Sequence, residues 1–171
     1  MIIGIISDTH DRHALTVAAI EAMKAAGAEL ILHCGEIESI QTVELFRGIP
    51  THFVRGNWDW NVRGLTDAAL AIGGSFFPGH GTIELDGKRI AWLHSHQKGL
   101  LRDLTESGQF DFVFHGHTHD ARVATHGHTT VICPGAMFKI RQKRCGVLNL
   151  ATGEYNSLLI PDPINNPSGK S

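Results

Sequence analysis

Acidic and histidine side chains follow the apolar segments of this sequence. Asp8 and His10 come directly after the run of residues 2–6, which contains no polar side chain. A strand buried on both faces cannot carry these groups in its middle, so we expect them at its carboxyl end, where open α/β sheets bind ligands. In extended geometry, residues i and i+2 point the same way, so the carboxylate and the imidazole lie side by side. Together they would supply half of the ligands of a metal site.

Further oxygen and imidazole ligands stand at the ends of later predicted strands: Glu36, Asn57, His94, His117 and His119. Such groups suit a divalent transition metal. Glycine precedes three of these ligands and lets the backbone turn sharply toward a shared centre. Seven ligands are too many for one four-coordinate ion, but they could supply two ions if one carboxylate bridges the pair and waters complete the coordination.

The first half of the chain predicts the elements that position these groups. Apolar strands over residues 2–6, 29–33 and 51–55 alternate with helices over residues 14–26 and 39–46. Strands separated by helices favour a parallel sheet with right-handed crossovers. All three strands then present their polar ends along one edge of the sheet, which brings Asp8, Glu36 and Asn57 together.

In the second half of the chain, the alternation of strands and helices gives way to strands joined by short turns, which predicts hairpins. A short helix near residues 65–72 precedes two strands, 80–85 and 88–94, that flank the hairpin signal Asp86-Gly87. A helix over residues 99–107, a strand over 110–115 and hairpins within 123–133 and 146–160 complete the pattern. With no internal repeat and no linker, the sequence predicts one domain over residues 1–160, followed by a loose C-terminal tail over residues 161–171.

Composition narrows the class of protein. Among 171 residues, 42% are hydrophobic and 19% charged, which is ordinary for a globular protein. A net charge of −2 gives no footprint for an extended nucleic acid. No apolar run is long enough for a membrane span, and the N-terminus lacks the pattern of a signal peptide, so we expect a cytoplasmic protein. The three cysteines contain no CxxC pair, which argues against a disulfide scaffold and a thiolate zinc site.

Five motifs, in this order, resemble those of the calcineurin-like metallophosphoesterases, and particularly their small bacterial and archaeal phosphodiesterase branch: Asp8-x-His10, Gly35-Glu36, Gly56-Asn57, His94 with His96, and Gly116-His117-Thr118-His119. The resemblance runs from residue 2 to about residue 135 and continues as a strand pattern to residue 160. It implies an α/β fold, a four-layer αββα sandwich of two mixed sheets flanked by helices, with a dimetal site at the carboxyl ends of the strands.

The resemblance also implies which residues share each ion. Asp8, His10 and His119 would hold one ion, Asn57, His94 and His117 the other, and Glu36 would bridge them. Within the segment LHSH, the match places His94 on the metal and leaves His96 as a neighbour. Asn57 and His94 would in addition lie near the phosphate oxygens of the substrate, as catalytic residues.

The sequence departs from the family pattern at two positions. Glu36 stands where the family normally has Asp, which changes the reach of the bridging carboxylate. Trp58 stands where many members have a histidine that acts as general acid, although the small branch often lacks it too. The motifs therefore do not identify the residue that protonates the leaving group. Asp59 is the nearest candidate in sequence, followed by His13 and His96.

These observations predict a metal-dependent phosphodiesterase or phosphatase acting on a small phosphoester. A hydroxide that bridges the two ions would attack phosphorus in line with the leaving oxygen. Ligand softness allows manganese, iron, zinc, nickel or cobalt, and the availability of each metal decides among them; we expect manganese. Two alternatives remain: a protein-interaction scaffold of the same fold with a weakened metal site, like the related retromer subunit, and a nuclease or nucleic-acid-binding module, which the net charge disfavours. The oligomeric state is open, a homo-oligomer included.

Overall fold

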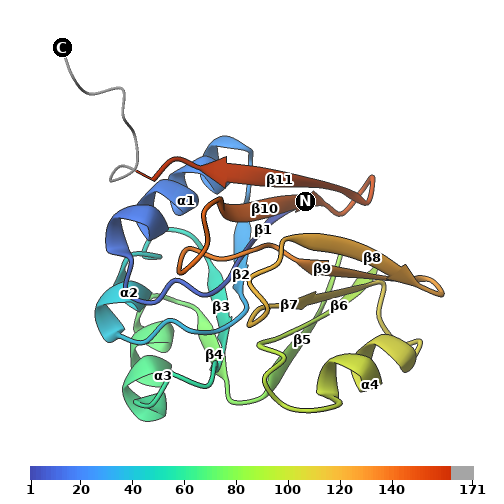
Figure 1. Cartoon of the computed structure of the whole chain (residues 1–171), viewed down its shortest axis with the longest axis horizontal. Coiled ribbons are helices and arrows are strands. Elements are labelled where there is room, and N and C mark those ends of the chain that lie inside the picture. Colours follow the sequence, from blue (N-terminus) through green and yellow to red (C-terminus); the bar gives the residue numbers. More distant parts are fainter. Residues whose placement is uncertain (163–171) are drawn as a thin grey trace.

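Two β-sheets packed face to face form the centre of the molecule (Figure 1). The computed structural model describes residues 1–162. The first sheet has six strands, in spatial order β11 (Glu154–Ile160), β10 (Lys143–Asn149), β1 (Ile2–Ile6), β2 (Leu30–His33), β3 (Thr51–Val54) and β4 (Ser75–Phe77). The second has five, in the order β5 (His80–Leu85), β6 (Lys88–Leu93), β7 (Phe112–His115), β9 (Thr129–Cys133) and β8 (Arg122–His126).

Helices cover the outer face of each sheet. Figure 1 shows α1 (His13–Ala25), α2 (Ile40–Glu44) and α3 (Val62–Ala71) beside the first sheet, and α4 (Leu100–Glu106) beside the second. The expected four-layer αββα sandwich is therefore confirmed. Both sheets are mixed: β1 to β4 run parallel with β10 antiparallel to β1, and β6, β7 and β9 run parallel with antiparallel strands at both edges.

The apolar strands alternate between two cores. On β1, Ile3 and Ile5 face the space between the sheets, where they join Trp92 and Phe114 from the second sheet. Ile6 faces the helices instead. Side chains of a strand point to opposite faces in turn, so a strand with two buried faces must be apolar throughout. This explains why β1 itself, Ile2–Ile6, contains no polar side chain and why the polar residues begin only at Ser7.

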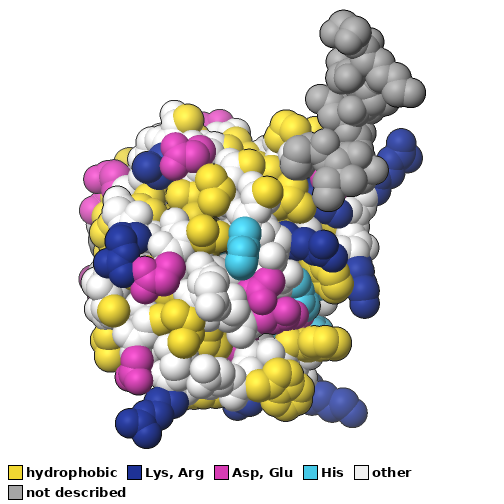
Figure 2. All heavy atoms as spheres, turned by 90° about the vertical axis from the view of Figure 1, so that its left-hand side faces the viewer, with side chains coloured by type: hydrophobic (Ala, Val, Ile, Leu, Met, Phe, Trp, Pro, Cys, Tyr) yellow, Lys and Arg dark blue, Asp and Glu magenta, His cyan; other side chains and the backbone are white. Residues whose placement is uncertain are grey.

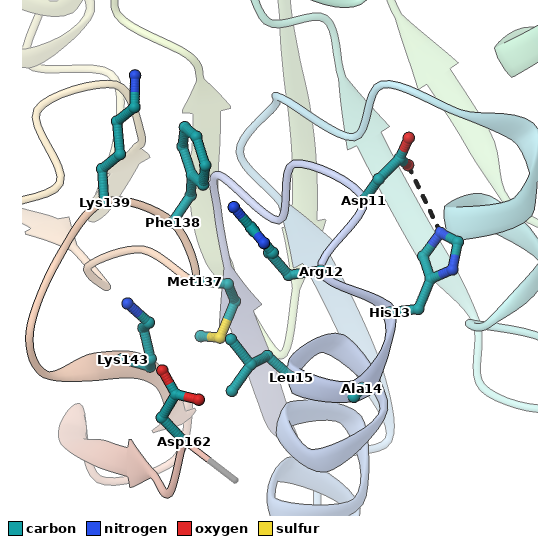
Figure 3. Close-up of a pocket in the computed structure, with 10 residues that line it drawn as sticks. All are labelled: Asp11, Arg12, His13, Ala14, Leu15, Met137, Phe138, Lys139, Lys143 and Asp162. Atoms are coloured by element: carbon teal, nitrogen blue, oxygen red, sulfur yellow. Dashed lines mark ion pairs between the residues drawn. The ribbon is translucent and has the colours of Figure 1, made fainter. Parts of the chain in front are cut away.

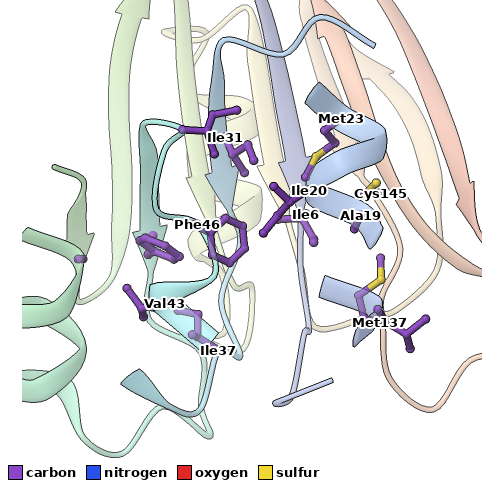
Figure 4. Close-up of a cluster of buried hydrophobic side chains, with 14 of the residues drawn as sticks. Ile6, Ala19, Ile20, Met23, Ile31, Ile37, Val43, Phe46, Met137 and Cys145 are labelled. Carbon is purple, nitrogen blue, oxygen red and sulfur yellow. The ribbon is translucent and has the colours of Figure 1, made fainter. Parts of the chain in front are cut away.

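The helical side of the first sheet has its own core (Figure 4). Ile6 and Ile31 lie against Ile20 and Met23 of α1, with Phe46 beside them. A smaller cluster beneath α4 joins Leu93, Val113 and Val131 to the apolar face of that helix. Because both faces of each sheet are packed, the strands are held rigidly and their carboxyl ends can position side chains with little freedom.

Most of the predicted elements are present, with shifted ends. The helix expected near residues 65–72 is α3, and the last hairpin begins at Lys143 rather than at residue 146. Strand β4, which pairs with β3, was not predicted. The single domain over residues 1–160 stays a prediction, and the predicted tail lies outside the described residues from residue 163 on. Within the described part, no helix is both long and apolar enough to cross a membrane.

Candidate metal centre

Four of the predicted ligands converge where strands from both sheets end. One ligand atom from each of Asp8, His10, Glu36 and His119 lies within 4.8 Å of the others. Asp8 and His10 follow β1, Glu36 follows β2 and His119 follows β7. Backbone hydrogen bonds tie the first two loops together: Asp8 N donates to Gly35 O at 3.0 Å and His10 N donates to Glu36 O at 3.0 Å. Asp8 thus contacts His117 and His119, which lie 109 and 111 positions further along the chain.

The backbone at these positions is unusual. Five of the seven predicted ligands have a positive φ between 43° and 75°: Asp8, His10, Glu36, His117 and His119. Non-glycine residues rarely adopt this left-handed region, and they persist there only when the surrounding structure holds them. Such residues cluster at functional sites, and here the conformation turns each side chain inward.

Glu36 lies between the two predicted sets of ligands. Its Oε2 is 2.6 Å from His10 Nε2, and its Oε1 is 3.4 Å from His94 Nε2. Glu36 is buried, as are both imidazoles. Each carboxylate oxygen thus faces a histidine of a different set, which is the arrangement expected of a bridging carboxylate.

The far nitrogen of each of these histidines is fixed by a hydrogen bond. His10 Nδ1 lies 2.5 Å from Glu38 Oε1, and His94 Nδ1 lies 2.9 Å from the carbonyl oxygen of Cys34. Both acceptors favour a proton on Nδ1, which leaves the lone pair of Nε2 directed at Glu36 and the centre of the site. Glu38 was missed by the sequence analysis. Its only signal there is an acidic residue two positions after Glu36.

Buried atoms without a partner show where a metal would fit. Six buried polar side-chain atoms in the described residues make no well-aligned hydrogen bond, and three of them belong to predicted ligands: Asn57 Oδ1, and His10 Nε2 and His94 Nε2, whose close contacts are with the Glu36 carboxylate. Leaving a buried polar atom unsatisfied is costly, so native proteins rarely do so. These are the atoms that a metal ion would coordinate, and the donor set of carboxylate, amide and imidazole suits one. The residues therefore fit a metal centre.

The electrostatics of the site keep Glu36 ionised. Burial opposes ionisation, but hydrogen bonding and charge from His10 and His94 outweigh it and lower the pKa of Glu36. Burial also disfavours a charged His10, yet the carboxylates of Glu36 and Glu38 outweigh this effect and raise its pKa. The pKa of His94 is raised in the same way, against the effect of its burial, mainly by Glu36 and Asp8. Without a metal, the buried carboxylates thus favour the protonated form of both imidazoles.

The loop after β7 closes the site from the second sheet. Asp8 Oδ2 accepts the backbone N–H of His117 at 3.2 Å, and Asp8 Oδ1 lies 3.1 Å from His119 Nε2. A Cβ at Gly116 would fall 1.9 Å from Ser7 Oγ, so only glycine allows this loop to approach β1 so closely. The rings of His117 and His94 lie 5.1 Å apart, centroid to centroid.

Asp59 has a different position from the one expected of a proton donor. Its buried carboxylate accepts four backbone N–H groups, from Glu36 at 3.0 Å, Ile37 at 2.8 Å, Glu38 at 2.7 Å and Gly56 at 2.7 Å. These contacts hold the loop that carries Glu36 against the loop that carries Asn57. The geometry favours a positioning role for Asp59 over the proton donation expected from the sequence.

The other residues considered as proton donors lie around the rim. His13 is exposed and stands 3.6 Å from Asp11. The ring of His96 lies tilted beside that of His94, with ring centroids 5.5 Å apart. Trp58 is 55% exposed, and its backbone N–H donates to Glu36 Oε1 at 3.3 Å. Its indole therefore borders the centre on the solvent side.

The fold and this convergence of ligands are those of a family. Residues 1–154 match the model of the calcineurin-like phosphoesterase superfamily domain, and the chain belongs to that superfamily.

Direct comparison with known proteins and solved structures finds individual relatives of this chain. The chain is 27% identical over 165 residues to the protein named phosphodiesterase MJ0936 of Methanocaldococcus jannaschii, an alignment that covers 94% of this chain and 99% of the relative. A solved structure described as a novel archaeal phosphodiesterase superposes with a TM-score of 0.88 at 26% identity, over 94% of this chain and 100% of that one. Yfce, a phosphoesterase from E. coli, superposes with a TM-score of 0.69 at 17% identity, over 94% and 100% of the two chains, and shares the fold.

Proposed function

We propose that this protein is a metal-dependent phosphodiesterase that hydrolyses small phosphodiesters. The observation that carries the proposal is the convergence of Asp8, His10, Glu36 and His119 within 4.8 Å, in a chain of the calcineurin-like superfamily. The relative from Methanocaldococcus jannaschii, named a phosphodiesterase, aligns over nearly the full length of both chains and supports the substrate class.

In this mechanism, the predicted ligands and the residues that orient them have separate roles. Asp8, His10 and His119 would hold one ion, Asn57, His94 and His117 would hold a second, and Glu36 would contribute its carboxylate to both. When bound, two such ions supply Lewis acidity, which activates a water and stabilises charge on the attacking and leaving oxygens. Glu38 and the Cys34 carbonyl keep the imidazoles of His10 and His94 in the orientation that directs Nε2 inward. Asn57 and His94 would also contact the phosphate oxygens.

The leaving group must depart with little help from the residue after Asn57. An indole ring, unlike an imidazole, does not transfer a proton near neutral pH, and Trp58 occupies that position. The protein should therefore prefer phosphodiesters whose leaving group is a weak base, such as a nitrophenolate. We also propose manganese as the metal, because carboxylate and imidazole ligands together suit it.

Hydrolysis of bis(p-nitrophenyl) phosphate with added Mn²⁺, alongside elemental analysis of the purified protein, tests the proposal. We expect metal-dependent turnover that Asp8→Asn and His117→Ala each reduce by roughly a hundredfold or more, because each removes a ligand. Circular dichroism should show that both variants remain folded.

A matched control is His128→Ala, which removes an exposed histidine from the β8–β9 turn. It should retain wild-type turnover and metal content. Full activity in Asp8→Asn or His117→Ala would contradict the two-metal mechanism. A protein that binds metal but turns over no phosphoester in a substrate panel would favour the scaffold alternative.

A further inference from the structure

Two indole rings are exposed beside the metal centre. Trp58 is 55% exposed and Trp60 is 76% exposed, whereas Trp92 is fully buried between the sheets. Both exposed rings belong to the loop of residues 56–60, which follows β3. Among the large hydrophobic side chains exposed in the described residues, these two are the only aromatic ones. One exposed apolar residue is ordinary, but two indoles in the loop that carries Asn57 leave a large flat apolar surface in water next to a predicted ligand.

Hydrogen bonds fix the backbone of this loop. The Asp59 carboxylate accepts the backbone N–H of Gly56 at 2.7 Å, and Asp59 N donates to Gly56 O at 3.3 Å. Trp60 N donates to Trp58 O at 3.0 Å, and Trp58 N donates to Glu36 Oε1 at 3.3 Å. The exposure of the Trp58 indole is therefore not that of a loose segment. A ring whose backbone is already ordered loses little conformational entropy when a ligand binds.

The indole of Trp58 lies next to predicted ligands of both ions. Its ring centroid is 6.2 Å from that of His10, with an angle of 78° between the two planes. Trp58 also follows Asn57 directly in the sequence, and its N–H contacts the carboxylate of Glu36. A phosphodiester whose phosphorus lies at this centre would therefore bring one of its ester groups within reach of the indole.

A second aromatic ring borders His10, but other groups already cover it. The rings of Phe138 and His10 lie 4.3 Å apart, centroid to centroid. The guanidinium of Arg12 and the ammonium of Lys139 each lie 5.0 Å from the Phe138 centroid, and Figure 3 shows the ring between them. In the part of the chain that the structure describes, no cation lies over the Trp58 indole in this way. The free aromatic surface at the metal centre is therefore that of Trp58.

We propose that the indole of Trp58 binds an aromatic ring of the substrate, so that the protein selects phosphodiesters that carry a planar aromatic group. The inference rests on the proposed function, because it places a phosphodiester at the metal centre. Stacking on an aromatic side chain is favourable for many different planar rings, since each has a π-face. Figure 2 shows hydrophobic side chains next to acidic and histidine side chains on one face of the molecule, as an apolar surface beside a metal centre requires.

Isothermal titration of the Mn²⁺-loaded protein with phenylphosphonate and with cyclohexylphosphonate tests the inference without turnover. The two ligands share the phosphonate group and carry six-membered rings, but only the phenyl ring is planar and aromatic. We expect the preference for phenylphosphonate to be about tenfold lower in Trp58→Leu than in the wild type, because leucine keeps an apolar contact but cannot stack. Trp58→Phe, which keeps an aromatic ring, should retain part of the preference.

Trp60→Leu is the matched control. It removes the other exposed indole of the same loop, which makes no ring contact with a predicted ligand in the described part of the chain. It should keep the wild-type preference for phenylphosphonate. A preference that Trp58→Leu leaves unchanged, or that Trp60→Leu lowers to the same extent, would overturn the assignment to Trp58 and favour a protein partner as the group that covers the exposed indoles.

Steady-state kinetics separate a binding role of Trp58 from a merely structural one. Bis(p-nitrophenyl) phosphate carries a ring on each ester oxygen, so one ring meets the indole in either orientation. Trp58→Leu should raise KM about tenfold and leave kcat nearly unchanged, because stacking is lost from the ground state and the transition state alike. A lower kcat with an unchanged KM would contradict the inference.

The binding and kinetic measurements also distinguish failure of this inference from failure of the proposed function. If no phosphodiester is hydrolysed, the proposed function fails, while a preference for phenylphosphonate that depends on Trp58 still supports the aromatic site. If bis(p-nitrophenyl) phosphate is hydrolysed but the preference for phenylphosphonate is the same in the wild type and in Trp58→Leu, the inference fails and the proposed function stands.

Discussion

His33 is an imidazole that the fold keeps neutral next to the metal centre. It is fully buried, with its ring against Phe46 and Phe53. Gly35 N donates to its Nδ1 at 3.2 Å, so the proton sits on Nε2, 3.1 Å from Thr9 Oγ1. The Thr9 hydroxyl in turn donates to Glu36 O at 3.2 Å. A second proton on His33 would break this chain of hydrogen bonds and bury a charge.

This predicts a loss of stability in mild acid. Burial lowers the pKa of His33 to about 3, against 6.5 in the unfolded chain. Between these values the unfolded state binds the proton and the folded state does not, so the free energy of unfolding falls as the pH falls. The contribution of His33 should approach about 1.4 kcal/mol per pH unit.

Urea denaturation of the chelator-treated protein, between pH 7 and pH 4, measures this slope. His33→Asn retains an acceptor near the position of Nδ1 but cannot take up the proton, so its slope should be smaller than that of the wild type. The other titrating histidines are common to both proteins and cancel in the difference. Equal slopes would mean that His33 is not the neutral buried group described above.

At the scale of elements, Asp59 connects the loops that follow β2 and β3. Its Oδ2 accepts the N–H groups of Glu36 and Gly56, and its Oδ1 accepts those of Ile37 and Glu38. A Cβ at Gly56 would lie 2.4 Å from Glu36 N, so glycine is required for this close approach. The bridging position of Glu36 is therefore set by a neighbouring strand end as much as by β2.

Asp59→Asn should weaken this connection. An asparagine has one acceptor oxygen, and its amide group would face two N–H donors, so two of the four hydrogen bonds are lost. We expect the free energy of unfolding to fall by about 3 kcal/mol and Mn²⁺ affinity to fall by about tenfold or more. Thermal denaturation and Mn²⁺ titration measure the two effects, with Asp67→Asn on the exposed face of α3 as the control. Unchanged metal affinity would limit Asp59 to a stabilising role.

Asp59 also shows what the sequence could and could not predict. The convergence of Asp8 and Glu36 followed from apolar runs that end in polar residues, because parallel strands present their ends at one edge. The place of His119, which follows a strand of the other sheet, was implied by the family resemblance. The roles of Glu38 and Asp59 depend on contacts that form only in the folded chain, between the Glu38 carboxylate and His10, 28 positions away, and between the Asp59 carboxylate and the N–H of Glu38, 21 positions away. Short-range patterns do not contain that information. The same holds for β4, a three-residue edge strand whose partner, not its sequence, defines it.

At the scale of the whole molecule, the predicted ligands come from both sheets. Asp8, His10, Glu36 and Asn57 follow strands of the first sheet, whereas His94, His117 and His119 follow β6 and β7 of the second. The two sheets otherwise meet through the apolar core between them. Metal ions held by both ligand groups would therefore link the sheets at their open edge, and metal binding should stabilise the entire domain rather than one loop.

The stability of the protein should consequently depend on metal and on ligands from either sheet. At a Mn²⁺ concentration about 100 times the dissociation constant, we expect the free energy of unfolding to rise by about 2.7 kcal/mol, because the ion binds only the folded state. EDTA should reverse the gain. Glu36→Gln, from the first sheet, and His117→Ala, from the second, should each remove much of it when measured by urea denaturation at the same Mn²⁺ concentration.

The two variants together decide how the sheets are joined. If the ions were held by ligands of the first sheet alone, His117→Ala would keep the full Mn²⁺-dependent gain while Glu36→Gln lost it. His128→Ala, in the exposed turn between β8 and β9, removes a histidine of the second sheet that is not a predicted ligand and should keep the whole gain. Loss of the gain in both ligand variants, with retention in His128→Ala, would show that the sandwich is closed at its edge by metal as well as by its apolar core.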